Sequence, residues 1–201
     1  MKILRSPLLT RILLILGSAL LLGAIVLFAL TLILPPIRAE KAGELVETLH
    51  GLMPAVADGV PDVRSDPTMS TVEVDGENFC GIIEIPAYSR KLPVHADWDA
   101  GKVTHYPCRY TGSIYQDGLI IGGSDNNGQL DFMKQISNGD TVYFTDMTGL
   151  RCSYTVTTIL RTDDVSTSNL TDGEADLTLF VRNSYGLDYI VVRCEIKSAD
   201  Q

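Results

Sequence analysis

The feature that most restricts the fold of this chain is an uncharged, strongly apolar run near its N-terminus. No charged residue occurs over residues 12–37, which is longer than the roughly 20 apolar residues that an α-helix needs to cross a bilayer. The run also exceeds the apolar region of about 7–15 residues found in cleaved signal peptides, and no clear cleavage site follows it. We therefore predict a retained transmembrane anchor at 12–34, with a cleaved signal as the alternative.

The charges around this run predict its orientation. Lys2, Arg5 and Arg11 precede it, and basic flanks stay in the cytoplasm. We expect a cytoplasmic tail at 1–11 and a single-pass cell-membrane protein whose C-terminal part is extracellular. All 25 acidic residues but only 13 of the 16 basic ones follow the run, so the exported part carries a formal charge of −12. That charge argues against nucleic acid as a partner, because nucleic-acid binding depends on Lys and Arg that neutralise phosphates.

The exported part is predicted to contain a connecting segment and one domain. After Pro35 and Pro36, the sequence IRAEKAGELVETLHGLM has the composition of a short helix with apolar residues at near-helical spacing. The following PAVADGVPDVRSDPTMS mixes Pro, Gly, Asp and Ser, which is typical of a linker. We therefore predict a juxtamembrane helix and linker at 35–70 and a folded domain at 71–201.

The sequence of the domain is mainly of β type. Short runs of apolar, β-branched and aromatic residues alternate with turn-forming residues, as in chains of short strands. LDFMKQI is the one good helical turn in this part of the chain. Seven or eight short strands with little helix predict a closed or nearly closed β-barrel. The strand candidates are GIIEIP, KLPV, DGLIIGG, TVYFTD, CSYTVTTIL, DLTLFV and YIVVRCEI.

The cysteines leave two alternatives open. An exported domain can keep disulfides, and four cysteines allow three complete pairings; buried free thiols are the other possibility. No C-x-x-C spacing occurs, which argues against zinc and thioredoxin-like sites. SDNNGQLD, at 124–131, lacks the ordered spacing and terminal Glu of a calcium loop, so we expect a polar loop there and neither a metal nor a cofactor. The four residues are Cys80, Cys108, Cys152 and Cys194.

A series of strings in the domain resembles the sortases, the surface cysteine transpeptidases of Gram-positive bacteria. The resemblance covers about residues 71–197 and keeps the order expected for the family. It implies an eight-stranded β-barrel with short helices, a site at one barrel end, and a sorting-signal peptide as substrate. The strings are GIIEIPAYSRKLPV, PCRYTGSIYQDGLIIGG, FMKQISNGDTVYFTDMTG, YTV, LTLF and VVRCE.

The same resemblance indicates that the family's catalytic groups are missing. The family uses a Cys thiolate as nucleophile, a His as acid or base, and an Arg that stabilises the oxyanion or holds the substrate. LTLFVR places Arg182 at the Cys position, LIIGGS places Ser124 at the His position, and Tyr189 occupies the Arg position. A guanidinium has no lone pair with which to attack a carbonyl. We therefore expect no intact catalytic triad and an inactive member of the family.

These substitutions favour a binding protein over an enzyme. The expected partner is a sorting peptide of a surface protein or pilin, or an active sortase. The enzymatic alternative is a transpeptidase or hydrolase that uses a displaced nucleophile. This nucleophile is either Cys108, with His105 three residues earlier as its base, or a displaced serine. A third possibility is a purely structural envelope domain with no peptide groove.

Overall fold

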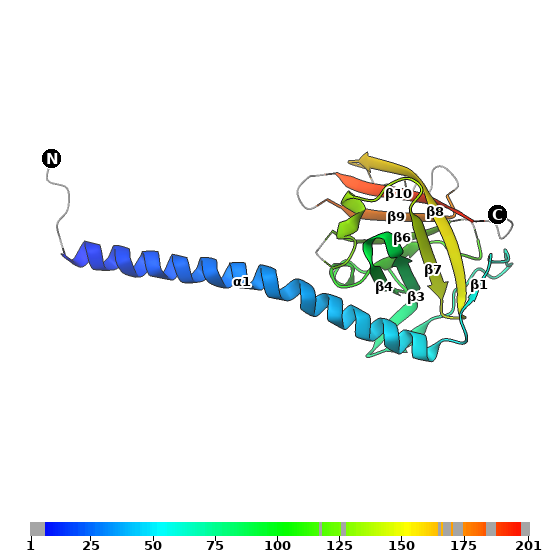
Figure 1. Cartoon of the computed structure of the whole chain (residues 1–201), viewed down its shortest axis with the longest axis horizontal. Coiled ribbons are helices and arrows are strands. Elements are labelled where there is room, and N and C mark those ends of the chain that lie inside the picture. Colours follow the sequence, from blue (N-terminus) through cyan, green and yellow to red (C-terminus); the bar gives the residue numbers. More distant parts are fainter. Residues whose placement is uncertain are drawn as a thin grey trace. The chain divides into compact units, whose positions relative to one another are not determined.

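The computed structural model describes residues 7–116, 118–125, 128–164, 166, 170, 175–183 and 188–197. Within this described part, the chain forms one long α-helix, α1 (Pro7–Leu52), ten strands and three short 3-10 helices (Figure 1). The strands are β1 (Ala57–Asp58), β2 (Val72–Val74), β3 (Glu77–Ile85), β4 (Arg90–His95), β5 (Cys108–Thr111), β6 (Leu119–Ser124), β7 (Thr141–Asp146), β8 (Leu150–Thr162), β9 (Leu177–Arg182) and β10 (Tyr189–Ile196). The short helices are η1 (Pro86–Tyr88), η2 (Lys102–Thr104) and η3 (Asp131–Lys134).

The chain divides into two compact units, Met1–Arg38 and Ala39–Gln201. The first contains the N-terminal part of α1, where Thr10–Leu30 has a mean hydropathy of 2.8 and is long and apolar enough to cross a membrane. α1 continues through Pro35 and Pro36, where the sequence had suggested the start of a separate helix.

The second unit is built around a closed β-barrel. The ring runs β3, β4, β5, β6, β9, β10, β8 and β7, and β7 then pairs with β3 to close it. Most neighbours are antiparallel, but β6 and β9 are parallel from Leu119↔Leu177 to Ser124↔Arg182. β1 and β2 lie outside the ring, paired with β8 and β3. The predicted eight-stranded barrel is therefore confirmed.

β6, β9 and β10 are apolar on both faces, and each face has a different role. Alternate side chains in a strand point to opposite faces. Ile121, Leu179 and Val192 belong to the main core, whereas Ile120, Phe180 and Val191 form a second apolar cluster. The runs LIIGG, LTLFV and YIVV are therefore continuous rather than alternating, because their second face is also buried.

β4 and β5 form the weakest seam of the ring. They pair in parallel at His95↔Cys108 only, with one flanking hydrogen bond of 2.8 Å from the His95 N–H to the Pro107 carbonyl. Most of this edge of β4 therefore has no strand partner in the described residues, which is a setting that tolerates Pro93 inside the strand. The loop that joins the two strands, 96–107, carries Trp98.

The C-terminal part of α1 is an integral element of the second unit. Val46 and Leu49 are buried and form one apolar cluster with Phe79, Ile82 and Met147 of the barrel. This stretch was expected to be a juxtamembrane helix outside a domain that starts near residue 71. Instead, its apolar side chains pack against residues of the barrel.

Residues 54–69, which read as a linker, lie along the barrel and are hydrogen-bonded to it. The Ala57 N–H donates to the Gly149 carbonyl at 2.9 Å, and the Arg64 N–H donates to the Tyr115 carbonyl at 3.1 Å. Met69, at the end of this stretch, is buried in the main core. Gly149 has φ +85° and its Cβ would lie 2.9 Å from the Ala55 carbonyl oxygen, so a larger residue there would disturb the contact.

The position of His50 predicts a pH dependence of stability. It lies in the last turn of α1, and its buried Nε2 has no hydrogen-bond partner among the described residues. Burial and the positive charges of Lys91 and Arg151 lower the pKa of His50, against the opposing effects of Glu47 and Glu84. The unfolded chain therefore takes up a proton at His50 first as the pH falls below about 6.5, so the free energy of unfolding decreases.

We expect His50→Gln to reduce this decrease in a chain that begins at Ala39. The measurement is urea unfolding at intervals from pH 7.5 to pH 5, a range above that in which most carboxylates titrate. Stability curves of the wild type and the variant that stay parallel over this range would contradict the assignment to His50.

Candidate functional site

The three positions singled out by the sortase resemblance lie side by side on adjacent strands. Arg182 ends β9 and is paired with Ser124, the last residue of β6. On its other side, Arg182 is paired with Tyr189, the first residue of β10. Residues about 60 apart in the sequence thus meet at one barrel end because β6 and β9 are parallel and in register.

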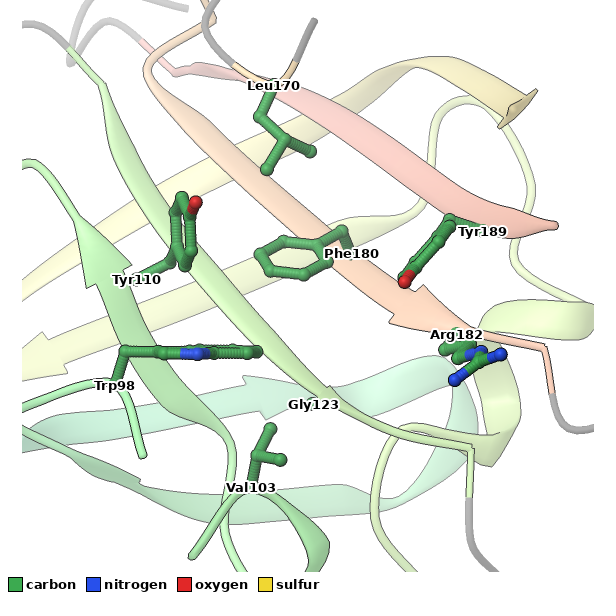
Figure 2. Close-up of a pocket in the computed structure, with 8 residues that line it drawn as sticks. All are labelled: Trp98, Val103, Tyr110, Gly123, Leu170, Phe180, Arg182 and Tyr189. Carbon is green, nitrogen blue, oxygen red and sulfur yellow. The ribbon is translucent and has the colours of Figure 1, made fainter. Parts of the chain in front are cut away.

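A pocket opens on the outer face of these strands. Its volume is about 230 Å³, and most of the surface that lines it is apolar. In Figure 2 the Phe180 ring lies in the middle, with Trp98 and Tyr110 on one side of it and Tyr189 and Arg182 on the other. The lining residues are Trp98, Val103, Tyr110, Gly123, Leu170, Phe180, Arg182 and Tyr189.

The apolar end of the pocket is a cluster of three aromatic rings. Trp98 stacks on Phe180 with ring centroids 5.5 Å apart and an angle of 28° between the planes. Tyr110 meets both rings edge-on, at 5.2 Å from Trp98 and 5.5 Å from Phe180. A Cβ on Gly122 would lie 2.4 Å from Phe180 Cζ and 2.5 Å from Trp98 Cζ3. Glycine at 122 therefore lets the rings lie directly on β6.

The other end of the pocket is polar. The side chain of Arg182 is exposed and makes no hydrogen bond or ion pair with any residue that the structure describes. Tyr189 is half-buried beside it, and its hydroxyl points into the pocket in Figure 2. Both side chains offer hydrogen-bond donors.

Ser124 is held by the loop that follows β6. Its N–H donates to the side-chain oxygen of Gln129, and its carbonyl accepts a 3.1 Å hydrogen bond from the Leu130 N–H. The Gln129 amide in turn donates to the Val103 carbonyl at 3.1 Å. The predicted polar loop lies partly outside the described residues, at Asn126 and Asn127. Of its described residues, Asp125 pairs with Lys134 at 2.8 Å.

These side chains can bind an anion or an apolar group, and none of them is a thiol that could form the thioester of the reaction that the resemblance implies. Arg182 has only donors. The Ser124 hydroxyl does not titrate near neutral pH, so it cannot replace an imidazole as the base. Tyr189 can donate one hydrogen bond but carries no positive charge. Loss of a nucleophile alone costs about 10⁶-fold in comparable covalent enzymes.

Cys108, the alternative nucleophile, is the first residue of β5, and His105, the alternative base, directly follows η2. Neither is among the described residues that line the pocket. Burial raises the pKa of Cys108 to about 11, and its thiol is 3.4 Å from the Tyr106 carbonyl oxygen. His105 is exposed, and its ring contacts that of Tyr106 at 6.4 Å. A catalytic cysteine has a lowered pKa and an accessible thiolate, which is the reverse of this environment.

All four cysteines are free and buried. Burial raises the pKa of Cys152 to about 11 and that of both Cys80 and Cys194 to about 12. Of the two alternatives left open by the sequence, the structure has buried free thiols.

Sequence reasoning identified Arg182, Ser124 and Tyr189 but did not identify Trp98 and Tyr110. Trp98 lies in the β4–β5 loop and Tyr110 in β5, and neither segment has a periodic pattern that marks it as part of a site. A usable signal was the pair Gly122 and Gly123 within an apolar strand, because glycine inside a strand often marks a close approach by another group.

Of the comparisons with known proteins, the one with solved structures identifies the fold. No protein-family model matches the chain, and no curated protein matches it in sequence. Solved structures do match. Sortase A from Corynebacterium diphtheriae aligns over 83% of this chain and 85% of its own, with 18% identity and a TM-score of 0.55.

Two further solved structures illustrate the range of the matches. Sortase C-1 from Actinomyces oris aligns over 80% of this chain and 99% of its own, with 20% identity and a TM-score of 0.54. Sortase A from Listeria monocytogenes aligns over 60% and 88%, with 17% identity and a TM-score of 0.51. At these identities the likeness concerns the fold. The chain therefore has the sortase fold, a closed eight-stranded β-barrel that follows one N-terminal apolar helix in the sequence.

Proposed function

We propose that this protein is a membrane-anchored, extracellular sortase-fold protein without transpeptidase activity, which binds a peptide or a protein partner in surface-protein or pilus anchoring. The observation that carries the proposal is that Ser124, Arg182 and Tyr189, the residues at the positions where the resemblance puts the catalytic groups, are neighbours at one barrel end. Arg182 and Tyr189 also line the pocket. The pocket and its aromatic rings are well formed although none of the three side chains fits the family's chemistry.

The anchor and its orientation belong to the same proposal. The helix over Thr10–Leu30 is compatible with a single membrane crossing. The basic residues Lys2, Arg5 and Arg11 favour a cytoplasmic N-terminus and an extracellular barrel. The partner would then be a sorting peptide, a pilin or an active sortase on the outer surface of the membrane.

The test separates binding from catalysis. The full chain in detergent micelles is incubated with synthetic sorting-signal peptides, and binding is followed by calorimetry while the intact protein mass is monitored. We expect saturable binding of at least one peptide and no increase in protein mass. An acyl adduct on any cysteine would show that the protein is an active transpeptidase, and absence of saturable binding by every peptide would favour a structural role.

A further inference from the structure

We infer that the pocket recognises a carboxylate joined to a bulky apolar side chain, with Arg182 and Tyr189 holding the carboxylate and the rings of Trp98 and Phe180 receiving the apolar group. This inference rests on the proposed binding function and gives the chemical class of the ligand. It follows from the arrangement of charge, aromatic rings and space in the pocket, set out below.

The first observation is that the Arg182 side chain differs from other arginines of the barrel in its ion-pair partners. Other arginines of the barrel have partners: Arg90 pairs with Asp131, Arg109 with Asp97, Arg151 with Glu84, and Arg161 with Asp188. Arg64 lies 3.8 Å over the ring of Tyr115. Arg182 has no such partner among the described residues, although acidic residues outnumber basic ones in this part of the chain. An unpaired guanidinium in an acidic domain favours an anionic ligand.

The arrangement of the rings argues against a cationic ligand. A cation binds over the exposed face of an aromatic ring. Here Trp98 and Phe180 form an offset stack, so each covers part of one face of the other, and Tyr110 is directed edge-on at both. The charge of Arg182 would also repel a cation in the same pocket. The rings therefore provide apolar surface for a side chain of the ligand.

The spacing along β9 fits one large amino-acid residue. Phe180 and Arg182 are two residues apart on the same face of the strand, which corresponds to about 7 Å. A carboxylate at Arg182 and an apolar side chain near Phe180 can thus belong to a single residue of the ligand. The pocket volume of about 230 Å³ is large enough for such a residue.

A carboxylate fits this site better than a phosphate. The guanidinium fork binds a carboxylate with two parallel hydrogen bonds, and the Tyr189 hydroxyl can donate a third. A phosphate group carries a charge of about −1.5 to −2, and Arg182 is the only cation among the described residues that line the pocket. The remaining lining side chains that the structure describes are apolar or aromatic, so they would not compensate a second negative charge.

Trp98 makes the inference directly measurable. It is the only tryptophan of the chain, it lines the pocket, and 40% of it is exposed. Its fluorescence therefore reports occupation of the site. The probes are N-acetylated tripeptides Ala-Ala-Leu with a free C-terminal carboxylate, the same peptide amidated, Ala-Ala-Ala with a free carboxylate, and an amidated peptide with an internal Glu next to Leu.

With the full chain in detergent micelles, we expect Ala-Ala-Leu with a free carboxylate to bind about 10- to 100-fold more tightly than its amide, the size of effect typical of a charge-assisted contact. Arg182→Gln should remove this difference, Arg182→Lys should keep part of it, and Tyr189→Phe should reduce it by a smaller factor. Lys91→Gln, which removes one positive charge from an exposed position of β4, is the matched control and should leave binding unchanged.

The outcomes distinguish the inference from the function on which it rests. Equal binding of acid and amide, or an unchanged preference in Arg182→Gln, would overturn the carboxylate site while leaving peptide binding intact. Competition by inorganic phosphate at lower concentration than acetate would also overturn it. Tight binding of the amidated Glu peptide would support the site and identify a side-chain carboxylate as its ligand, whereas tight binding of the free acid alone identifies a chain terminus. No binding of any peptide would remove the proposed function as well.

Discussion

Replacement of Arg182 by cysteine is expected to create a thiol that reacts about 10²- to 10³-fold faster with a small maleimide at pH 7.5 than any cysteine of the wild-type protein. The physical reason is the fraction of thiolate. The four native thiols are buried, and their pKa values are raised to about 11 or 12, whereas an exposed cysteine has a pKa near 8.5. Position 182 is exposed at the pocket. Because the thiolate is the reactive species, its fraction sets the labelling rate.

The measurement is the rate of mass increase of the intact protein, with peptide mapping to identify the labelled residue. The wild-type protein should react slowly at all four cysteines. The opposite result, fast labelling of Cys108 alone in the wild type, would revive the alternative in which Cys108 acts with His105. It would need a motion that exposes the thiol and lowers its pKa, since neither holds in this structure.

Replacement of Leu49 by alanine is expected to lower the free energy of unfolding of a chain that begins at Ala39 by about 2–5 kcal/mol, the usual cost of removing a buried leucine side chain. Leu49 is fully buried against Phe79, Ile82 and Met147. For a domain of this size, such a loss corresponds to a decrease in Tm of several degrees or more. Equilibrium unfolding in urea, followed by Trp98 fluorescence, gives the value.

The matched control is Leu52→Ala, one turn further along the same helix. Leu52 is 54% exposed, so its replacement should change stability by less than about 0.5 kcal/mol. A chain that begins at Thr71 should be less stable than one that begins at Ala39, because it lacks Val46, Leu49 and Met69. Equal stability of Leu49→Ala and Leu52→Ala would show that α1 does not contribute to the folded barrel.

Most strands were predictable because their signals are local. TVYFTD and YIVVRCEI coincide with β7 and β10, and DLTLFV and CSYTVTTIL lie within one or two residues of β9 and β8. β5 was not predicted, since CRYT is short, half polar and irregular in its pairing with β6. The stretch 54–69 was interpreted as a linker because its composition is that of a loop, while its hydrogen bonds to Gly149 and Tyr115 depend on residues far away in the sequence.

The site was predictable only in part for the same reason. Arg182, Ser124 and Tyr189 could be placed at one barrel end because the resemblance supplied the order of the strands, and the parallel pairing of β6 with β9 brings them together. Trp98 and Tyr110 reach the pocket through ring contacts with Phe180. Such contacts follow from the packing of a loop on a sheet, which no periodicity in the sequence specifies.

The single pair between β4 and β5 has a consequence for the size of ligand that the barrel can admit. The loop that connects these strands carries Trp98 and Val103, which form one wall of the pocket. Separation of β4 from β5 disrupts one residue pair between the strands, His95↔Cys108. Separation of β6 from β9 would disrupt six such pairs. We therefore expect the wall with Trp98 to move with the loss of fewer strand pairs when a larger ligand binds. The wall with Arg182 keeps its geometry.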